Sequence, residues 1–271
     1  MTSEMKRVNV SFSGGESSGY MCHLLKTHPK YKDLEYKFVF ANTGQEHPET
    51  IEFVNKCDEF FNLNLIWIEA KVYHGKRKSC GFSITNYEEC SQKGEPFEEV
   101  VKKYGLPNTT FKLCTRDLKT NPMTAYRKHV GWHDYPTALG MRHDEPKRIK
   151  SFFYPLNELE KDKQDVNDFW ESQPFRLGIK THMGNCTWCI EKSIKKLATV
   201  YKENPEFFDF PKRLEELYSE TGPTPDGTPR KLFRGGLMVK DIAEASKTVG
   251  PLKYNEDEGS GCSESCEVFS D

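Results

Sequence analysis

The feature that most constrains this chain is a strand that ends in a turn of glycines and serines and continues as a helix. Residues 8–12 alternate as a buried strand does, and residues 19–25 have the apolar spacing of a helix. The turn between them, Ser13–Ser18, would present backbone N–H groups at the positive end of the helix dipole, and its glycines would let an anion come close. The stretch therefore predicts an anion site, although a capped helix after an ordinary turn fits the same residues. It has no Gly-Lys-Ser/Thr, so it is not a Walker A loop.

The rest of the pattern predicts an α/β protein. After the first strand, we expect buried strands over residues 36–41, 63–68 and 135–140. We expect helices over residues 48–61, 98–104, 114–129, 166–171 and 205–218, and a further long helix opened by residues 184–189. Strands that alternate with helices favour a mostly parallel, doubly wound sheet. Ligands of such sheets bind beyond the carboxyl ends of the strands, where Ser13–Ser18 and Asn42–Glu46 both fall.

The chain is long enough for one sizeable core with a smaller appended part. We expect residues 1–180 to form the α/β domain and residues 181–271 a helical region that carries Cys186 and Cys189. The end of that region is acidic and predicts a mobile, cysteine-containing tail. Residues 72–113 lack a clear period and suggest a mobile or substrate-facing insertion.

Charge and hydropathy exclude several classes of function. The 39 basic and 41 acidic residues nearly cancel, so no overall field draws the chain to nucleic acid. The N-terminus lacks the apolar core of a signal peptide, and no run approaches the ~20 apolar residues that span a bilayer. Nine cysteines without an export signal indicate a reducing cytoplasm, where thiols are unmodified, catalytic or metal-bound.

Several blocks together resemble a known family. Ser13–Ser18 resembles the Ser-Gly-Gly-x-x-Ser pyrophosphate loop of the PP-loop ATP pyrophosphatases and sulfonucleotide reductases, although family members often have Lys and Asp where Glu16 and Ser17 stand. Further blocks resemble those of phosphoadenosine phosphosulfate (PAPS) reductases, namely Asn42–Thr50, Cys114–Pro122, and Gly140–Arg142 with Arg148. Because the blocks follow in order, the chain is identified as a PAPS reductase-like member of the adenine nucleotide alpha-hydrolase superfamily.

The resemblance implies an adenine nucleotide, PAPS, APS or ATP, bound at the carboxyl edge of the sheet. The residues that it places around the nucleotide are Ser13, Gly14, Gly15, Ser17, Ser18, Asn42, Thr43, Gly44, Arg116, Lys119, Gly140, Arg142 and Arg148. Arginine can grip a phosphate with two parallel hydrogen bonds. The alternative for Arg142 and Arg148 is that they are surface charges paired with Asp144 and Glu145.

The cysteines predict a soft metal centre. Cys186 and Cys189 have the spacing of two thiolates around one metal, and Cys114 is the third ligand by resemblance. Zinc and a [4Fe–4S] cluster both suit such ligands, with a fourth position left open or filled by Cys80, Cys262 or Cys266. Packing as small apolar side chains and a redox dithiol are alternatives for the pair. Cys22 and Cys57 lie on helical stripes and are expected to pack.

Three functions are consistent with these residues. The first is thiol-dependent sulfonucleotide reduction with a thioredoxin-type donor, in which Cys266 would be the catalytic nucleophile, although the family's Glu-Cys-Gly pattern is absent. The second is an ATP pyrophosphatase, with Mg²⁺, that adenylates a substrate such as nucleic acid for sulfur transfer. The third is a catalytically silent nucleotide-binding protein. A homo-oligomer is compatible with all three.

Overall fold

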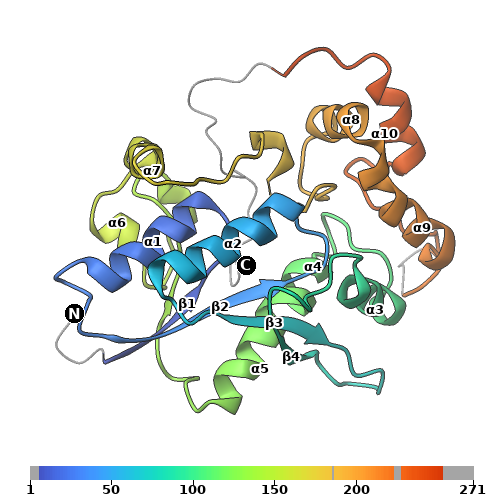
Figure 1. Cartoon of the computed structure of the whole chain (residues 1–271). Coiled ribbons are helices and arrows are strands. Elements are labelled where there is room, and N and C mark those ends of the chain that lie inside the picture. Colours follow the sequence, from blue (N-terminus) through green and yellow to red (C-terminus); the bar gives the residue numbers. More distant parts are fainter. Residues whose placement is uncertain (1–5, 185, 223–226, 253–271) are drawn as a thin grey trace.

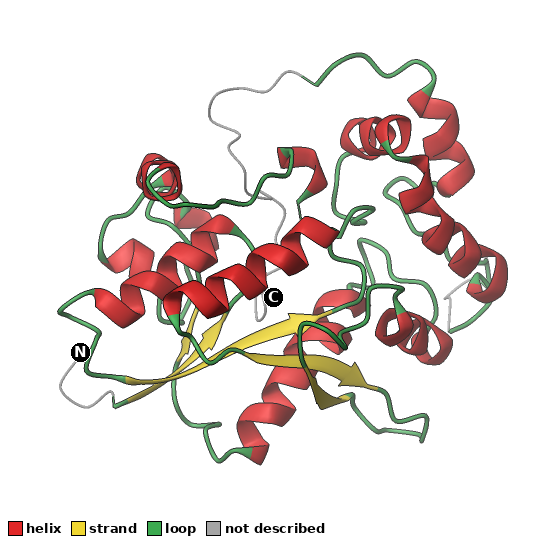
Figure 2. Ribbon diagram, viewed as in Figure 1, coloured by secondary structure: helices red, strands yellow, loops and turns green. Residues whose placement is uncertain are grey.

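The computed structural model describes residues 6–184, 186–222 and 227–252. A five-stranded sheet in the order β4-β3-β2-β1-β5 organises the chain, and helices cover both of its faces (Figures 1 and 2). The strands are β1 (Arg7–Ser11), β2 (Glu35–Asn42), β3 (Ile66–Lys71), β4 (Gly81–Thr85) and β5 (Thr137–Ala138). Only β4 runs antiparallel to its neighbour among the pairings of these strands. The predicted α/β class with a mostly parallel sheet is therefore confirmed.

Alternation along the central strands sends side chains to two different helical layers. Val8 and Phe38 contribute to the layer under α1 and α2, whereas Val39 packs toward α5, where it meets Met123 and Tyr126. On the first face lie α1 (Glu16–Thr27), α2 (Pro48–Phe61), α6 (Pro155–Glu158) and α7 (Lys163–Glu171), and on the other lies α5 (Asn121–His129) (Figure 1). Cys22 and Cys57 are fully buried in the first layer, as predicted.

A second hydrophobic core lies beside the sheet. Its helices are α3 (Glu95–Tyr104), α4 (Leu113–Thr115), α8 (Ile194–Glu203), α9 (Asp209–Tyr218) and α10 (Val239–Ser246). Phe97 and Leu113 pack in one cluster with Leu197, Phe208 and Leu232. Residues before and after position 180 thus share this core, and the predicted domain boundary at that position stays a prediction.

Several predicted elements begin or end elsewhere. The helix expected to open at residues 184–189 begins later, because α8 starts at Ile194, where the Ser193 side chain caps it by accepting from Lys196 N. The third strand is β3, Ile66–Lys71, rather than residues 63–68. The chain leaves α2 through Asn62, which follows the helix in a left-handed conformation, so the strand begins later. The predicted strand over 135–140 is reduced to the two residues of β5, Thr137–Ala138. Strand β4 and helix α10 were not predicted.

None of the helices in the described part of the chain combines the length and apolar composition needed to cross a membrane.

The second core contains a buried carboxyl group that should make stability depend on pH. Glu215 is 5% exposed, and both of its oxygens accept from Val239 N at 3.1 Å, at the start of α10. The pKa of Glu215 is raised from 4.5 to about 7, mainly by burial; the hydrogen bond from Val239 N opposes this shift, and the charges of Asp241 and Lys240 make smaller contributions that raise and lower it. The folded protein therefore binds this proton more tightly than the unfolded chain does, and the free energy of unfolding should fall as pH rises from 4.5 through 7.

We expect Glu215→Gln to remove that part of the pH dependence. The difference in unfolding free energy between wild type and variant should change by up to about 3 kcal/mol between pH 4.5 and pH 8, in the direction that favours the variant at high pH. Urea denaturation at several pH values measures it, with the exposed Glu220→Gln as the control. A parallel pH profile for wild type and Glu215→Gln would contradict the assignment.

Candidate functional site

The Ser13–Ser18 loop is closed by its own serines. Ser18 Oγ accepts from Ser13 N at 3.2 Å and from Ser13 Oγ at 2.9 Å, and it donates to Gly15 O at 2.8 Å. Gly14 has φ +83°, and a Cβ there would lie 2.9 Å from Thr50 Cγ2. Gly15 differs, because the nearest atom to its Cβ position is 3.9 Å away. The loop is thus built rigidly around Gly14 and leaves space over Gly15, at the start of α1.

The segment after β5 lies against this loop. A Cβ on Gly140 would come within 2.8 Å of Ser18 Cα, so this glycine permits the close approach. Just beyond it, Arg142 Nη1 lies 3.4 Å from Ser17 Oγ, and the same guanidinium donates to Asp144 at 2.8 and 3.1 Å. The structure therefore brings Gly140 and Arg142 to the predicted anion site, with Arg142 held in an ion pair.

A further carboxylate, that of Glu145, lies close to both Arg142 and Arg148. Glu145 lies 3.6 Å from Arg142 Nη1 and also pairs with Arg148 Nη1. The ion pairs proposed as the alternative for these arginines are present in the structure. The contact between Arg142 and Ser17 adds proximity to the loop, so the two descriptions are compatible for Arg142.

Asn42 has a supporting position beside the site. It is fully buried, and its amide donates to Glu69 Oε1 at 2.7 Å and to Ser91 O at 2.8 Å, while Gly44 N donates to its carbonyl oxygen at 3.2 Å. All of these contacts hold backbone segments together. The resemblance placed Asn42 among the nucleotide ligands, whereas its polar atoms are engaged within the protein.

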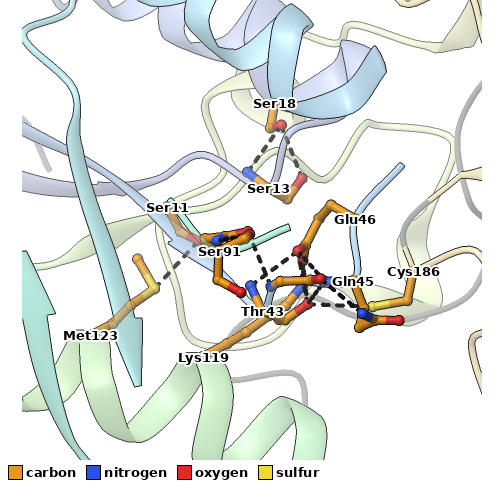
Figure 3. A network of polar contacts seen from close by, with 12 residues as sticks. Ser11, Ser13, Ser18, Thr43, Gln45, Glu46, Ser91, Lys119, Met123 and Cys186 are labelled. Carbon is orange, nitrogen blue, oxygen red and sulfur yellow. Dashed lines mark hydrogen bonds and ion pairs between the residues drawn. The ribbon is translucent and has the colours of Figure 1, made fainter. Parts of the chain in front are cut away.

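The loop after β2 holds a buried carboxylate that the resemblance did not single out (Figure 3). Glu46 accepts from Thr43 N at 3.0 Å and from Thr43 Oγ1 at 2.8 Å. Lys119 Nζ lies 3.8 Å from the same carboxylate, and both side chains are at least nine-tenths buried. Thr43 Oγ1 lies in turn 3.6 Å from Cys186 Sγ. Because β1 and β2 are parallel neighbours, the loops that follow them lie at the same end of the sheet, and this network is therefore on the same side as Ser13–Ser18. In the sequence, the signal that could have identified Glu46 was its position in the loop that follows a predicted strand.

The cysteine-bearing loop is bound to the loop after β2. Glu46 and Cys186 form an antiparallel bridge, and Thr187 N donates to Gln45 O at 3.4 Å. Trp188 Nε1 donates to Gln45 Oε1 at 2.6 Å. Underneath lies Lys192, which is fully buried and had no signal in the sequence. Its ammonium donates to three carbonyls of this loop, those of Gly184, Cys186 and Thr187, at 2.9, 2.5 and 3.1 Å.

The three predicted metal ligands lie near one another but do not assemble a metal site. Burial, with a smaller contribution from the nearby Cys189 thiol, raises the pKa of Cys114 to about 12. Burial and the Glu46 carboxylate raise the pKa of Cys186 well above its ordinary value. Within residues 6–184, 186–222 and 227–252, no group of three or more His, Cys, Asp or Glu side chains could hold a metal ion. The described residues therefore do not support the expected zinc or iron–sulfur centre.

The remaining predicted residues have other surroundings. Cys80 Sγ donates to Asp117 Oδ1 at 3.8 Å rather than joining the other thiols. Arg116 pairs with the same Asp117 at 2.7 Å, and its guanidinium lies over the Tyr104 ring. Cys262 and Cys266 lie outside the described residues, so the predicted catalytic role of Cys266 and the predicted mobile tail stay predictions.

Comparison with known proteins gives the family context of this geometry. A phosphoadenosine phosphosulfate reductase domain model matches residues 7–164, which contain the loop of β1 and the segment after β5. The cysteine pair at 186 and 189 lies beyond the matched region. The chain is 34% identical over 285 residues to the uncharacterized nin region protein ORF290 of Escherichia phage lambda, across 96% of this chain and 94% of the phage protein.

Two uncharacterized proteins of Methanocaldococcus jannaschii match smaller parts. MJ0973 is 34% identical over 99 residues, and MJ0066 is 26% identical over 137 residues. These matches cover 36% and 51% of this chain, and 23% of each of the two longer proteins. Both are uncharacterized and assign no reaction to this chain.

Proposed function

Because the chain belongs to the phosphoadenosine phosphosulfate reductase family, we propose that it binds an adenine nucleotide over Ser13–Ser18 and acts on it as an enzyme. The observation that carries this proposal is the space over Gly15 in a loop that is otherwise closed by its own hydrogen bonds. The N-terminus of α1 lies at that point and favours a negative charge. A loop that is ordered in advance binds an anion without a further entropic cost of ordering.

Charged groups beside the loop would balance the phosphates. Arg142 already contacts Ser17, and its pair with Asp144 is at the rim, where exchange of a carboxylate for a phosphate oxygen costs little. Lys119 reaches the same edge from the helical run after Cys114. Together with Arg148, these residues are the proposed source of positive charge for the nucleotide.

The reaction that we favour is thiol-dependent reduction of a sulfonucleotide. A cysteine thiolate attacks the sulfate sulfur of PAPS or APS, the bond from sulfur to the phosphate oxygen breaks, and the nucleotide leaves with that electron pair. The cysteine then carries an S-sulfo group, which a thioredoxin-type dithiol converts to sulfite while being oxidised to a disulfide. Cys266 is the proposed nucleophile, on resemblance alone.

A second candidate is supported by Glu46. This buried carboxylate lies at the carboxyl end of the sheet, where we propose the nucleotide to bind, and it would repel an additional anionic group there. Carboxylate oxygens are, however, the hard ligands that Mg²⁺ prefers. That observation favours ATP with Mg²⁺, and release of pyrophosphate as in the PP-loop pyrophosphatases. Nucleic acid would then be a candidate acceptor for the activated group.

One set of assays distinguishes these proposals. Calorimetry with PAPS, APS and ATP tests binding, sulfite release with thioredoxin tests reduction, and pyrophosphate release from ATP with Mg²⁺ tests the alternative. If the reaction is thiol-dependent reduction, Cys266→Ser should abolish sulfite release without weakening nucleotide binding. Cys262→Ser is the matched control, since it makes the same substitution four residues earlier. Binding without either product would leave a silent nucleotide-binding protein, and absence of binding to all three nucleotides would refute the proposed function.

A further inference from the structure

Glu16 places a negative charge inside the loop that we propose as a phosphate site. It is the first residue of α1, directly after Gly15. An acidic residue there stabilises the helix, but the same positive helix end is what attracts a phosphate. Two anions at one helix end repel each other unless one of them is neutralised. The Glu16 side chain is 2% exposed, so solvent does not screen its charge.

Arg176 provides the neutralising charge from a distant part of the chain. Its Nε lies 3.1 Å from Glu16 Oε1 and its Nη2 lies 3.2 Å from Glu16 Oε2, which is the two-pronged geometry of a strong arginine–carboxylate pair. Arg176 follows α7 by a few residues and is itself 37% exposed. The ion pair therefore connects the buried Glu16 carboxylate to an arginine that is partly exposed to solvent.

Helix α7 holds the same turn of α1 by two further contacts. Trp170 Nε1 donates to Glu16 O at 2.9 Å, so the backbone of Glu16 is fixed as well as its side chain. The Trp170 ring lies so close to α1 that a Cβ on Gly19 would come within 2.8 Å of it. These contacts keep the Glu16 carboxylate turned toward Arg176.

We propose that Arg176 is a positioning residue that neutralises Glu16, holds its carboxylate away from the ligand and thereby sets the affinity of the loop for phosphate groups. The inference rests on the proposed function, since it concerns the same loop. Without Arg176, a buried carboxylate would lose this two-pronged ion pair beside the bound phosphates. The affinity for a charged nucleotide should then fall, whereas that for the uncharged adenosine should change little.

The test measures the dissociation constants of ATP and adenosine by calorimetry for wild type, Arg176→Met, Glu16→Gln and the double variant. Arg176→Met should weaken ATP binding by about tenfold or more. The double variant, which has no unpaired charge, should bind ATP within about threefold of wild type. Glu171→Gln is the control, because Glu171 is the other acid near Arg176, at 4.0 Å, and is largely exposed.

The outcomes separate this role from a purely structural one and from the proposed function. Unchanged ATP binding by Arg176→Met, or a double variant that binds ATP no better than Arg176→Met, would overturn the role of Arg176. An equal loss for adenosine and ATP would also overturn it, because it would indicate general damage to the site. If Arg176→Met does not fold, Arg176→Gln, which also lacks the positive charge but keeps a polar side chain, gives the same comparison with and without Glu16→Gln. A wild-type protein that binds no adenine nucleotide would refute the proposed function, and this role with it.

Discussion

Gly15→Val is expected to abolish binding of adenine nucleotides while the protein stays folded. Gly15 has φ −99° and ψ 161°, an extended conformation that valine adopts readily. Apart from the neighbouring residues, the closest atom to its Cβ position is Ser13 Oγ at 3.9 Å, so the new side chain starts in open space rather than in a packed region. It would instead occupy the space over the loop, where a phosphate must approach the backbone. Loss of several charge-assisted hydrogen bonds, at about 1.5–3 kcal/mol each, corresponds to a loss of orders of magnitude in affinity.

The matched control is the neighbouring glycine. Gly14→Ala puts a Cβ at φ +83° and 2.9 Å from Thr50 Cγ2, so this variant should lower the melting temperature. Calorimetry with ATP and PAPS, together with thermal unfolding, measures both effects. Nucleotide affinity that is unchanged in Gly15→Val would remove the Ser13–Ser18 loop from the binding site.

Local signals in the sequence were sufficient to predict the parallel strands β1, β2, β3 and β5 and this loop. The alternation of residues 8–12 and the two glycines specify a strand and a turn without help from distant residues. Strand β4 was missed because it is an exposed, antiparallel edge strand, in which Ile84 is 65% exposed and Ser83 and Thr85 are polar. Its position depends on pairing with β3, which a local pattern does not encode.

The partners of the site residues were less predictable than the residues themselves. Ser17, Gly140 and Arg142 were expected at the site and do meet there. Glu16 pairs with Arg176 across 160 positions of the chain, a contact that only the folded arrangement of α1 and α7 creates.

The loop that carries Cys186 and Cys189 shows the opposite case. The spacing of these cysteines predicted the start of a helix, which the structure does not have there. Two cysteines separated by two residues are typical of the start of a helix, yet residues 186–189 form a turn in which Cys189 N donates to Cys186 O at 3.1 Å. The turn is held by Gln45 and by the buried Lys192, neither of which has a distinctive signal in the sequence.

Lys192→Met should destabilise the protein strongly and loosen the cysteine-bearing loop. The ammonium of Lys192 is fully buried, and its three protons are used by the carbonyls of Gly184, Cys186 and Thr187. Methionine has a similar length but donates no hydrogen bond, so Gly184 O and Thr187 O would lose this donor, whereas Cys186 O would keep the hydrogen bond from Cys189 N. At about 1–3 kcal/mol for each of the two groups that lose the lysine, we expect a loss of about 2–6 kcal/mol in unfolding free energy and a melting temperature lower by about 5 °C or more.

The control for this variant is Lys195→Met, which makes the same substitution at an exposed position at the start of α8. It should leave the melting temperature within about 2 °C of wild type, since surface substitutions change stability little. The second measurement is the rate of alkylation at Cys186 and Cys189, which are 8% and 5% exposed in the structure. Without Lys192, the loop loses its attachment from below and keeps its contacts to Thr43, Gln45 and Glu46, so both thiols should react faster in Lys192→Met than in Lys195→Met. Equal melting temperatures and equal alkylation rates in the two variants would show that the lysine does not hold this loop in place.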